Sequence, residues 1–310
     1  MNKYFTTFIA VILTVIGIAS TCKVGESAQY LPVAAFENLT LDSRCINSYG
    51  AGLIRLADDS LLVGTYTHHK LHKTPSFDYP KDYHSIDFLY EKTREDGQLI
   101  ALFKSDSDKP VTGGYDTFEA ALVYGFELYE QDNLNVIFGG GLAVGDFGIE
   151  LSNGDIWPVI PVPIFRVKYE SPMVNAKFDF ITSPNLQFTV GPEKTLRLKG
   201  DFRIDQFRDS RDLIYEVALM YRLHSKEPAG GDYGGVSLGV KNDNYGAFNL
   251  GRSPDESLEL HYNALFAELD LAVLKVTGGY AFNGRELYGE ETKHDLGDGY
   301  FMSVQITYPL

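Results

Sequence analysis

Apolar and charged residues alternate along much of the chain between residues 165 and 224. In 165–170, Phe, Val and Tyr alternate with Arg, Lys and Glu, and the same rule holds across 174–180, 196–205 and 213–223. Successive side chains of a strand point to opposite faces, so the pattern predicts consecutive strands with one apolar face and one face carrying both signs of charge. In an exported protein, this favours a barrel whose apolar face meets lipid and whose charged face lines the lumen.

Turn signals divide the chain at regular intervals. Short polar turns are predicted at 58–60, 95–97, 131–133, 171–172 and 208–210, and longer polar connections at 70–84, 105–114, 145–158, 183–194 and 225–233. Alternation of short and long connections is typical of outer-membrane barrels, which have short periplasmic turns and longer external loops. We therefore expect an all-β fold, a single antiparallel transmembrane β-barrel of roughly 14 strands (about 12 to 16), because each strand needs about ten residues.

Three stretches bear on the strand count. A strand is expected near 32–42, before the one at 49–57, and the final strand is expected at 300–308 after a long external loop at about 284–298. Residues 234–250 fit either one strand or a hairpin that turns at 241–243. Residues 258–282 are too long for one strand within a bilayer.

The first 28 residues have the features of a signal peptide. Lys3 precedes an apolar run from Phe5 to Ile18 that is short for a membrane span, and small residues follow it. Cleavage after Ala19 or after Ala28 fits, which leaves residues 29–310 as the barrel. The earlier site would keep both cysteines, so that Cys22 and Cys45 could pair, whereas the later site would leave Cys45 alone.

Composition narrows the function classes. The formal net charge of −15 disfavours nucleic-acid binding, which needs clustered Lys and Arg. The 20 Phe and 20 Tyr residues, against a single Trp, fit aromatic belts at a membrane interface. A partner is therefore expected in membrane lipid rather than in nucleic acid.

Two segments carry a resemblance to known proteins. Val304, Ile306, Tyr308 and Leu310 share one face of the last strand, which resembles the terminal signature that barrel-assembly machinery reads in bacterial outer-membrane proteins, although Leu replaces the usual final Phe. The stretch from Trp157 to Ile164 resembles uncharacterised porin-like barrels of unknown function. The resemblance implies a barrel in the outer membrane of a Gram-negative bacterium. It implies no catalytic residue and no cofactor, and it leaves a homo-oligomer open.

The predicted lumen face holds the main candidate site. Its charged members are Arg166, Lys168, Glu170, Lys177, Asp179, Arg197, Lys199, Asp201, Arg203 and Glu216. In a water-filled pore such residues set charge selectivity. Because the signs are mixed, the same residues could instead pair across strands and close a narrow interior.

Other motifs are weaker. His68, His69 and His72 lie close in sequence, but no further ligand completes a metal-site spacing, and Glu286, Glu290, Glu291, Asp295 and Asp298 fit a solvated acidic loop better than a calcium site. Gly139–Gly141 is expected in a strand, where it would allow close packing or curvature. Neither His224 with Ser225 nor His261 with Asn263 forms a catalytic arrangement, so no enzyme is predicted.

Three functions follow from the sequence. The first is a passive outer-membrane pore or small-solute channel with a charged lumen. The second is a structural or surface-interaction barrel whose lumen is closed by salt bridges. The third is an exported soluble barrel or sandwich that binds an apolar ligand, in which the apolar residues would point inward.

Overall fold

The computed structural model describes residues 28–73, 80–110, 117–131, 133–145, 158–181, 183–192, 196–204, 213–222, 234–247, 257–271, 273–288 and 292–308. Residues 1–27 of the expected signal peptide, including Cys22, lie outside these ranges, as do Leu310 and the turn expected at 208–210. Within them, no helix has the length and apolar character to cross a membrane.

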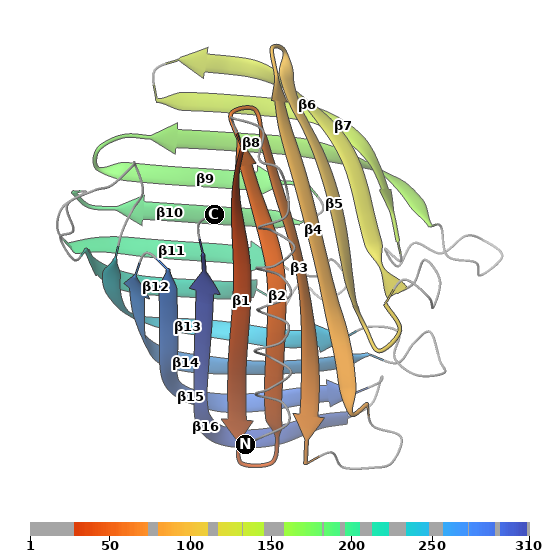
Figure 1. The fold of residues 1–310 in the computed structure, drawn as a ribbon, viewed down its shortest axis with the longest axis vertical. Coiled ribbons are helices and arrows are strands. Elements are labelled where there is room, and N and C mark those ends of the chain that lie inside the picture. Colours follow the sequence, from red (N-terminus) through yellow and green to blue (C-terminus); the bar gives the residue numbers. More distant parts are fainter. Residues whose placement is uncertain are drawn as a thin grey trace.

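The described residues form sixteen strands, all paired antiparallel in one closed barrel (Figure 1). The strands are β1 (Ala28–Leu41), β2 (Cys45–Ala57), β3 (Ser60–His72), β4 (Asp82–Arg94), β5 (Gly97–Ser107), β6 (Glu119–Gln131), β7 (Leu134–Val144), β8 (Val159–Glu170), β9 (Val174–Phe180), β10 (Pro184–Val190), β11 (Leu196–Ile204), β12 (Leu213–Arg222), β13 (Gly235–Ala247), β14 (Leu258–Leu271), β15 (Leu274–Tyr288) and β16 (Thr292–Thr307). The predicted all-β barrel is confirmed, at the upper end of the expected strand range.

Each strand pairs with its neighbours in sequence, and β1 pairs with β16 to close the ring. Val33 lies opposite Thr307 and Leu39 opposite Phe301 across this closing pair. Closure leaves no free sheet edge along most of the wall, which removes a template for aggregation. The last strand, whose Val304 and Ile306 were expected to be read during assembly, is therefore the one that completes the barrel.

The two faces of the wall differ as the alternation predicts. Large apolar side chains are exposed on the outside, with Leu122 57% and Leu238 62% exposed. The residues adjacent to them in sequence point to the inside and are buried, as Val123 and Ser237 are. Soluble proteins rarely expose so many large apolar side chains together. The arrangement is the opposite of the one that the soluble alternative requires.

The barrel is flattened rather than round. In Figure 1 the steep strands β1–β5 lie in front of the nearly horizontal strands β8–β13, so the two walls cross at a large angle. Cα atoms of β5 and β13 approach within 8 Å, although these strands are half the ring apart. The interior is therefore narrow where these two walls meet.

One predicted loop is a strand. Residues 183–194 were expected to form a long external connection, yet β10 occupies Pro184–Val190 and pairs with β9 and β11. In β10, Leu186 and Phe188 alternate with polar residues, but the run is short and lies within a polar stretch, so it was not predicted as a strand. Because of this extra strand, β12 ends and β13 begins at the barrel end where β1 begins and β16 ends. Residues 225–233, which were expected to form an external loop, lie outside the described residues.

The ambiguous C-terminal third forms four long strands. Residues 235–247 are the single strand β13, without a turn at 241–243, and residues 258–282 fall in two paired strands, β14 and β15. The long loop expected at 284–298 is also mostly strand, because β15 and β16 continue through it with bulges near Ala281 and Gly284.

Gly139 and Gly141 allow β6 and β7 to approach closely. A Cβ at either glycine would lie 2.0 Å from a carbonyl oxygen of β6, that of Tyr124 or of Leu122. Cα atoms of β6 and β8 come within 8 Å with β7 between them, so the wall curves sharply here. The expected role in close packing and curvature is confirmed.

The wall is low at the β9–β10 hairpin. Each of these strands has seven residues, and β9 pairs with β8 only from Phe165 to Glu170. Within the described residues, the first half of β8, from Val159 to Ile164, is hydrogen-bonded to β7 alone. Pro158 O accepts from Gly145 N, and Glu170 N donates to Asn133 O, so the backbone groups of even-numbered residues in β8 point toward β7. The backbone nitrogens of the odd-numbered Pro161 and Pro163 therefore point the other way, toward the open edge. Proline lacks an N–H, and it protects such an edge from pairing with another strand.

Candidate functional site

The charged interior is the candidate site. The pairing register places all ten sequence-predicted residues on the face that also carries the buried Ala218 and Ile164. They come from four strands, β8, β9, β11 and β12, and β10 lies between β9 and β11. Whether they line a solute path stays a prediction, but their contacts are distinct enough to separate three groups.

The first group is a bridge across the interior. Arg166 on β8 is 6% exposed and forms ion pairs with Asp179 on the adjacent β9 and with Glu91 on β4, where Nη2 lies 2.9 Å from Oε1. Its Nη1 donates to Gln98 Oε1 on β5 at 2.6 Å. We call these four residues the Arg166 bridge. Because β4 and β8 are not neighbours in the sheet, this guanidinium joins two walls.

The second group consists of pairs within one wall. Lys177 Nζ lies 2.7 Å from Asp179, and Lys199 Nζ lies 3.1 Å from Glu216. Asp201 accepts from Gln187 on β10 at 3.1 Å. Lys168 and Glu170 pair at 2.9 Å, but both are exposed near the barrel end where β1 begins and β16 ends. These contacts are those of a mixed-charge lattice on the inner face.

Arg197 differs from the rest. It is 4% exposed, and its Nε and Nη2 are buried without a hydrogen-bond partner. Buried polar groups nearly always have a partner, and a buried unpaired charge is destabilising. Arg203 lies opposite Asn185 on β10 and has interactions of its own. Arg197 is thus buried in the described part of the wall with two guanidinium nitrogens unpartnered, and whether it meets a solute stays a prediction.

An apolar cluster also joins the two walls, and the sequence analysis missed it. Tyr245 on β13 packs edge-on against His69 on β3, with ring centroids 5.9 Å apart. We call the surrounding buried set the Tyr245 cluster: Leu39, Leu41, Ile46, Leu71, Tyr83, Ala218, Tyr245, Leu258, Leu260, Tyr262, Ala264, Phe266, Ala281, Leu296 and Phe301. A signal was present, because the inner positions of β14 from 258 to 266 are all apolar. A second cluster around Ile100 and Ile164 fills the curved corner at β5–β8.

The three neighbouring histidines are separated by strand alternation. His69 points inward, stacks on Tyr83 and lies within hydrogen-bonding distance of two serines, Ser48 Oγ at 2.8 Å and Ser85 Oγ at 3.0 Å. Ser85 in turn donates to Asp106. This buried chain satisfies His69 rather than exposing a nucleophile, since His69 is 9% exposed. His68 and His72 lie on the outer face.

The acidic segment expected at the last loop is not uniformly solvated. Glu286 is fully buried and forms a bidentate pair with Arg44, at 2.6 and 2.9 Å. Arg44 also donates to the Lys73 carbonyl, so it links the β1–β2 turn to β15 and to the end of β3. The interpretation of Glu286 as a solvated residue is wrong, because β15 extends farther than predicted. Glu290 and Glu291 lie outside the described residues.

Part of the inner face is exposed to solvent. Asp87 on β4 and Lys104 on β5 lie opposite one another on the inner face, and both are exposed. Lys104 pairs with Asp106 at 3.2 Å. Water therefore reaches the inner face between the two regions where the walls are joined.

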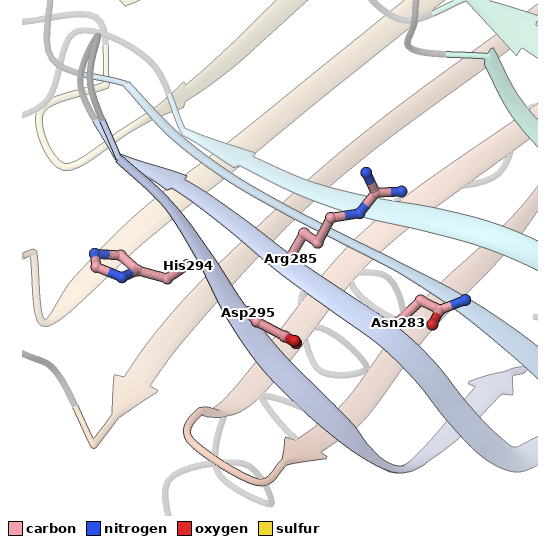
Figure 2. Close-up of a pocket in the computed structure, with 4 residues that line it drawn as sticks. All are labelled: Asn283, Arg285, His294 and Asp295. Carbon is pink, nitrogen blue, oxygen red and sulfur yellow. The ribbon is translucent and has the colours of Figure 1, made fainter.

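The β15–β16 hairpin forms a shallow hollow of about 420 Å³ lined by Asn283, Arg285, His294 and Asp295. Figure 2 shows Asn283 and Arg285 projecting from β15 and the other two side chains from β16. All four residues are exposed, and Asp295 accepts from the Gly297 amide at 2.9 Å. Within the described residues, no group of three His, Cys, Asp or Glu side chains has metal-site geometry, here or elsewhere.

No protein-family model matches the sequence, and no curated protein matches it. Among solved structures, the chain is similar to the outer membrane protein OprD from Pseudomonas aeruginosa, with 10% identity, a TM-score of 0.39 and coverage of 92% of this chain and 93% of that one. It is also similar to OccAB4 from Acinetobacter baumannii, with 11% identity, a TM-score of 0.33 and coverage of 92% and 98%. A bacterial polysaccharide outer membrane secretin gives 13% identity, a TM-score of 0.33 and coverage of 93% and 100%. Likeness at this level does not bear on function, and the barrel assignment rests on the strand pairing.

Proposed function

We propose that the chain is an integral barrel of the outer membrane of a Gram-negative bacterium and a narrow passive channel for small solutes. The observation that carries this proposal is the inversion of polarity across one wall, with large apolar side chains exposed outside and charges of both signs inside. The only spanning sheet that satisfies its backbone in lipid is a closed barrel. The exposed Asp87 and Lys104 support a hydrated interior.

A structural barrel with a closed lumen is the second candidate. It is favoured by the two places where opposite walls are joined, the Arg166 bridge and the Tyr245 cluster. On this alternative, the ion pairs stabilise the wall and the external connections do the work. In the channel, the Arg166 bridge would narrow the solute path. In the structural barrel, it would stabilise the closed interior.

Membrane location is tested first. We expect the full chain, expressed with its own N-terminus, to stay in the outer-membrane fraction after carbonate washing. Its band should shift on a gel between unboiled and boiled samples. A protein that leaves the membrane on washing and shows no shift would overturn both barrel functions.

Conductance then separates the candidates. The purified barrel in a planar bilayer should conduct, and Arg166→Met should increase the single-channel conductance because the cross-wall bridge is lost. Lys168→Met is the matched control, since Lys168 lies two residues along the same inner face and its ion-pair partner among the described residues is the exposed Glu170. If neither wild type nor Arg166→Met conducts in any salt, and Arg166→Met merely unfolds earlier, the structural candidate stands.

A further inference from the structure

We propose that the barrel wall has a side opening that admits the alkyl chain of a single-chain amphiphile. The opening lies where β8 extends past the end of the β9–β10 hairpin, in the wall of nearly horizontal strands (Figure 1). Residues Val159–Ile164 of β8 pair with β7, whereas described pairing with β9 begins only at Phe165. We call this break in the pairing the β8 gap. The inference rests on the proposed membrane location, and it goes beyond the channel because the route leads sideways through the wall.

Within the described residues, the β8 gap is not closed by backbone hydrogen bonds. Pro161 and Pro163 turn their ring nitrogens toward it, and without an N–H they cannot donate to another strand. A further strand, from this chain or from a second copy, is therefore a poor occupant. Elsewhere, opening the wall would break backbone hydrogen bonds that lipid cannot replace. At the gap, only side-chain contacts have to separate.

Apolar side chains close the β8 gap from inside. Ile160, Val162 and Ile164 point inward and belong to, or pack against, the second apolar cluster, the one around Ile100. Leu89 on β4 packs against the same cluster. By contrast, the inner faces of β9 and β11 carry charged residues that form ion pairs. The apolar part of this inner face therefore coincides with the break in strand pairing.

The outside of the β8 gap is apolar as well. Val159 and Phe165 are exposed on the outer face of β8, and Leu142, opposite Pro161 on β7, is 57% exposed. Apolar side chains therefore line the wall on both faces at the gap. An alkyl chain that moves through it exchanges one apolar contact for another, whereas a polar solute would lose its hydration without gaining hydrogen bonds from these side chains.

The interior beside the cluster suits the polar end of the occupant. On β4 and β5, the inner positions next to Leu89 and Leu102 are Asp87 and Lys104, which are exposed. Solvent thus reaches the inner face two residues, about 7 Å, from the cluster. The carbonyl oxygens of the two prolines also face the gap, and at membrane depth they need a donor, which water around a polar head supplies. A phospholipid of the bilayer keeps its head group at the membrane surface, so the arrangement fits a single-chain amphiphile better.

Bromine, which quenches tryptophan fluorescence on contact, provides the test. Trp157, the single tryptophan of the chain, is replaced by Phe, and each full-length variant then receives one new tryptophan. Ile160→Trp reports on the β8 gap, Phe266→Trp on the paired inner face of β14, and Leu142→Trp on the outer face. In phosphatidylcholine vesicles titrated with dibrominated stearic acid, Ile160→Trp and Leu142→Trp should lose fluorescence, with saturation for Ile160→Trp. Phe266→Trp should keep its fluorescence, since both neighbours of β14 are paired with it.

Vesicles of brominated phosphatidylcholine carry the same quencher on a bilayer lipid and should quench Leu142→Trp alone. Equal quenching of Ile160→Trp by both probes assigns the gap to bilayer lipid and overturns the single-chain proposal. If stearic acid leaves Ile160→Trp unquenched, or quenches Phe266→Trp as strongly, the side opening is overturned while the channel stands. Leu142→Trp that neither probe quenches overturns the membrane location together with the opening. Heat-modifiable mobility establishes that each variant is folded, and Leu102→Trp, in contact with the same cluster, replaces Ile160→Trp if the latter fails to fold.

Discussion

The two walls of the barrel contact each other across the interior in two regions, and these regions differ in chemistry. The Arg166 bridge uses ion pairs and an amide contact, and its carboxylates keep 15% and 17% of their side-chain surface exposed. The Tyr245 cluster uses aliphatic and aromatic packing, with Leu260 and Tyr262 fully or almost fully buried. Water can replace the partners in an ion pair, but it cannot replace packed apolar groups at low free-energy cost. We therefore expect the Arg166 bridge, rather than the Tyr245 cluster, to be the region that can open while the barrel stays folded.

The largest effect is expected from breaking the Tyr245 cluster. Leu260→Ala should lower the free energy of unfolding by about 2–5 kcal/mol, because it removes a fully buried side chain. Urea unfolding in detergent micelles, followed by the gel shift, measures it. Leu265→Ala on the outer face of the same strand is the control and should change little, since Leu265 is 54% exposed. Equal effects of the two substitutions would contradict the packed interior.

Breaking the Arg166 bridge should have a smaller effect on stability. Arg166→Met leaves Glu91 and Asp179 without their guanidinium and should lower the free energy of unfolding by about 1–3 kcal/mol, less than for a dry pair because the carboxylates keep some contact with water. The same urea titration measures it. An unchanged midpoint would show that the bridge contributes nothing to the folded state.

Arg197→Met should act with the opposite sign. The same substitution, on another strand of the same wall, removes a buried guanidinium whose Nε and Nη2 have no partner. The expected change is a gain of about 1 kcal/mol in the free energy of unfolding. If Arg197→Met destabilises as much as Arg166→Met, the two arginines have equivalent surroundings and the distinction between them fails.

The smallest effect is that of salt. Raising the salt concentration from about 0.1 M to about 1 M shortens the screening length from about 10 Å to about 3 Å. The difference in unfolding free energy between wild type and Arg166→Met should shrink, while that of Leu260→Ala should not fall. Parallel urea titrations at both salt concentrations test this, and a salt-independent difference for both variants would contradict the ionic nature of the bridge.

Period-two alternation was enough to predict the antiparallel barrel, the apolar outer face and the inward face of β8, β9, β11 and β12. It failed at β10, where seven residues between Pro184 and Val190 look like a polar connection. It also gave no sign that Glu91 meets Arg166, because alternation reports which face a residue occupies and not which residue lies across the interior. The two residues are 75 positions apart in the sequence, and they meet because the barrel is flattened.

The low wall at β9 and β10 also has a consequence for the surrounding bilayer. Seven residues rise about 23 Å along a strand, and a tilt near 45° leaves about 16 Å along the membrane normal. The apolar band of a transmembrane barrel is about 25 Å tall, so in the proposed membrane location the hydrocarbon would face a local mismatch beside Pro161 and Pro163. Lipid relieves such a mismatch by thinning. A membrane-embedded barrel of this shape would then be surrounded by a lopsided annulus, thinnest at one hairpin, and neighbouring proteins with short spans would gather on that side.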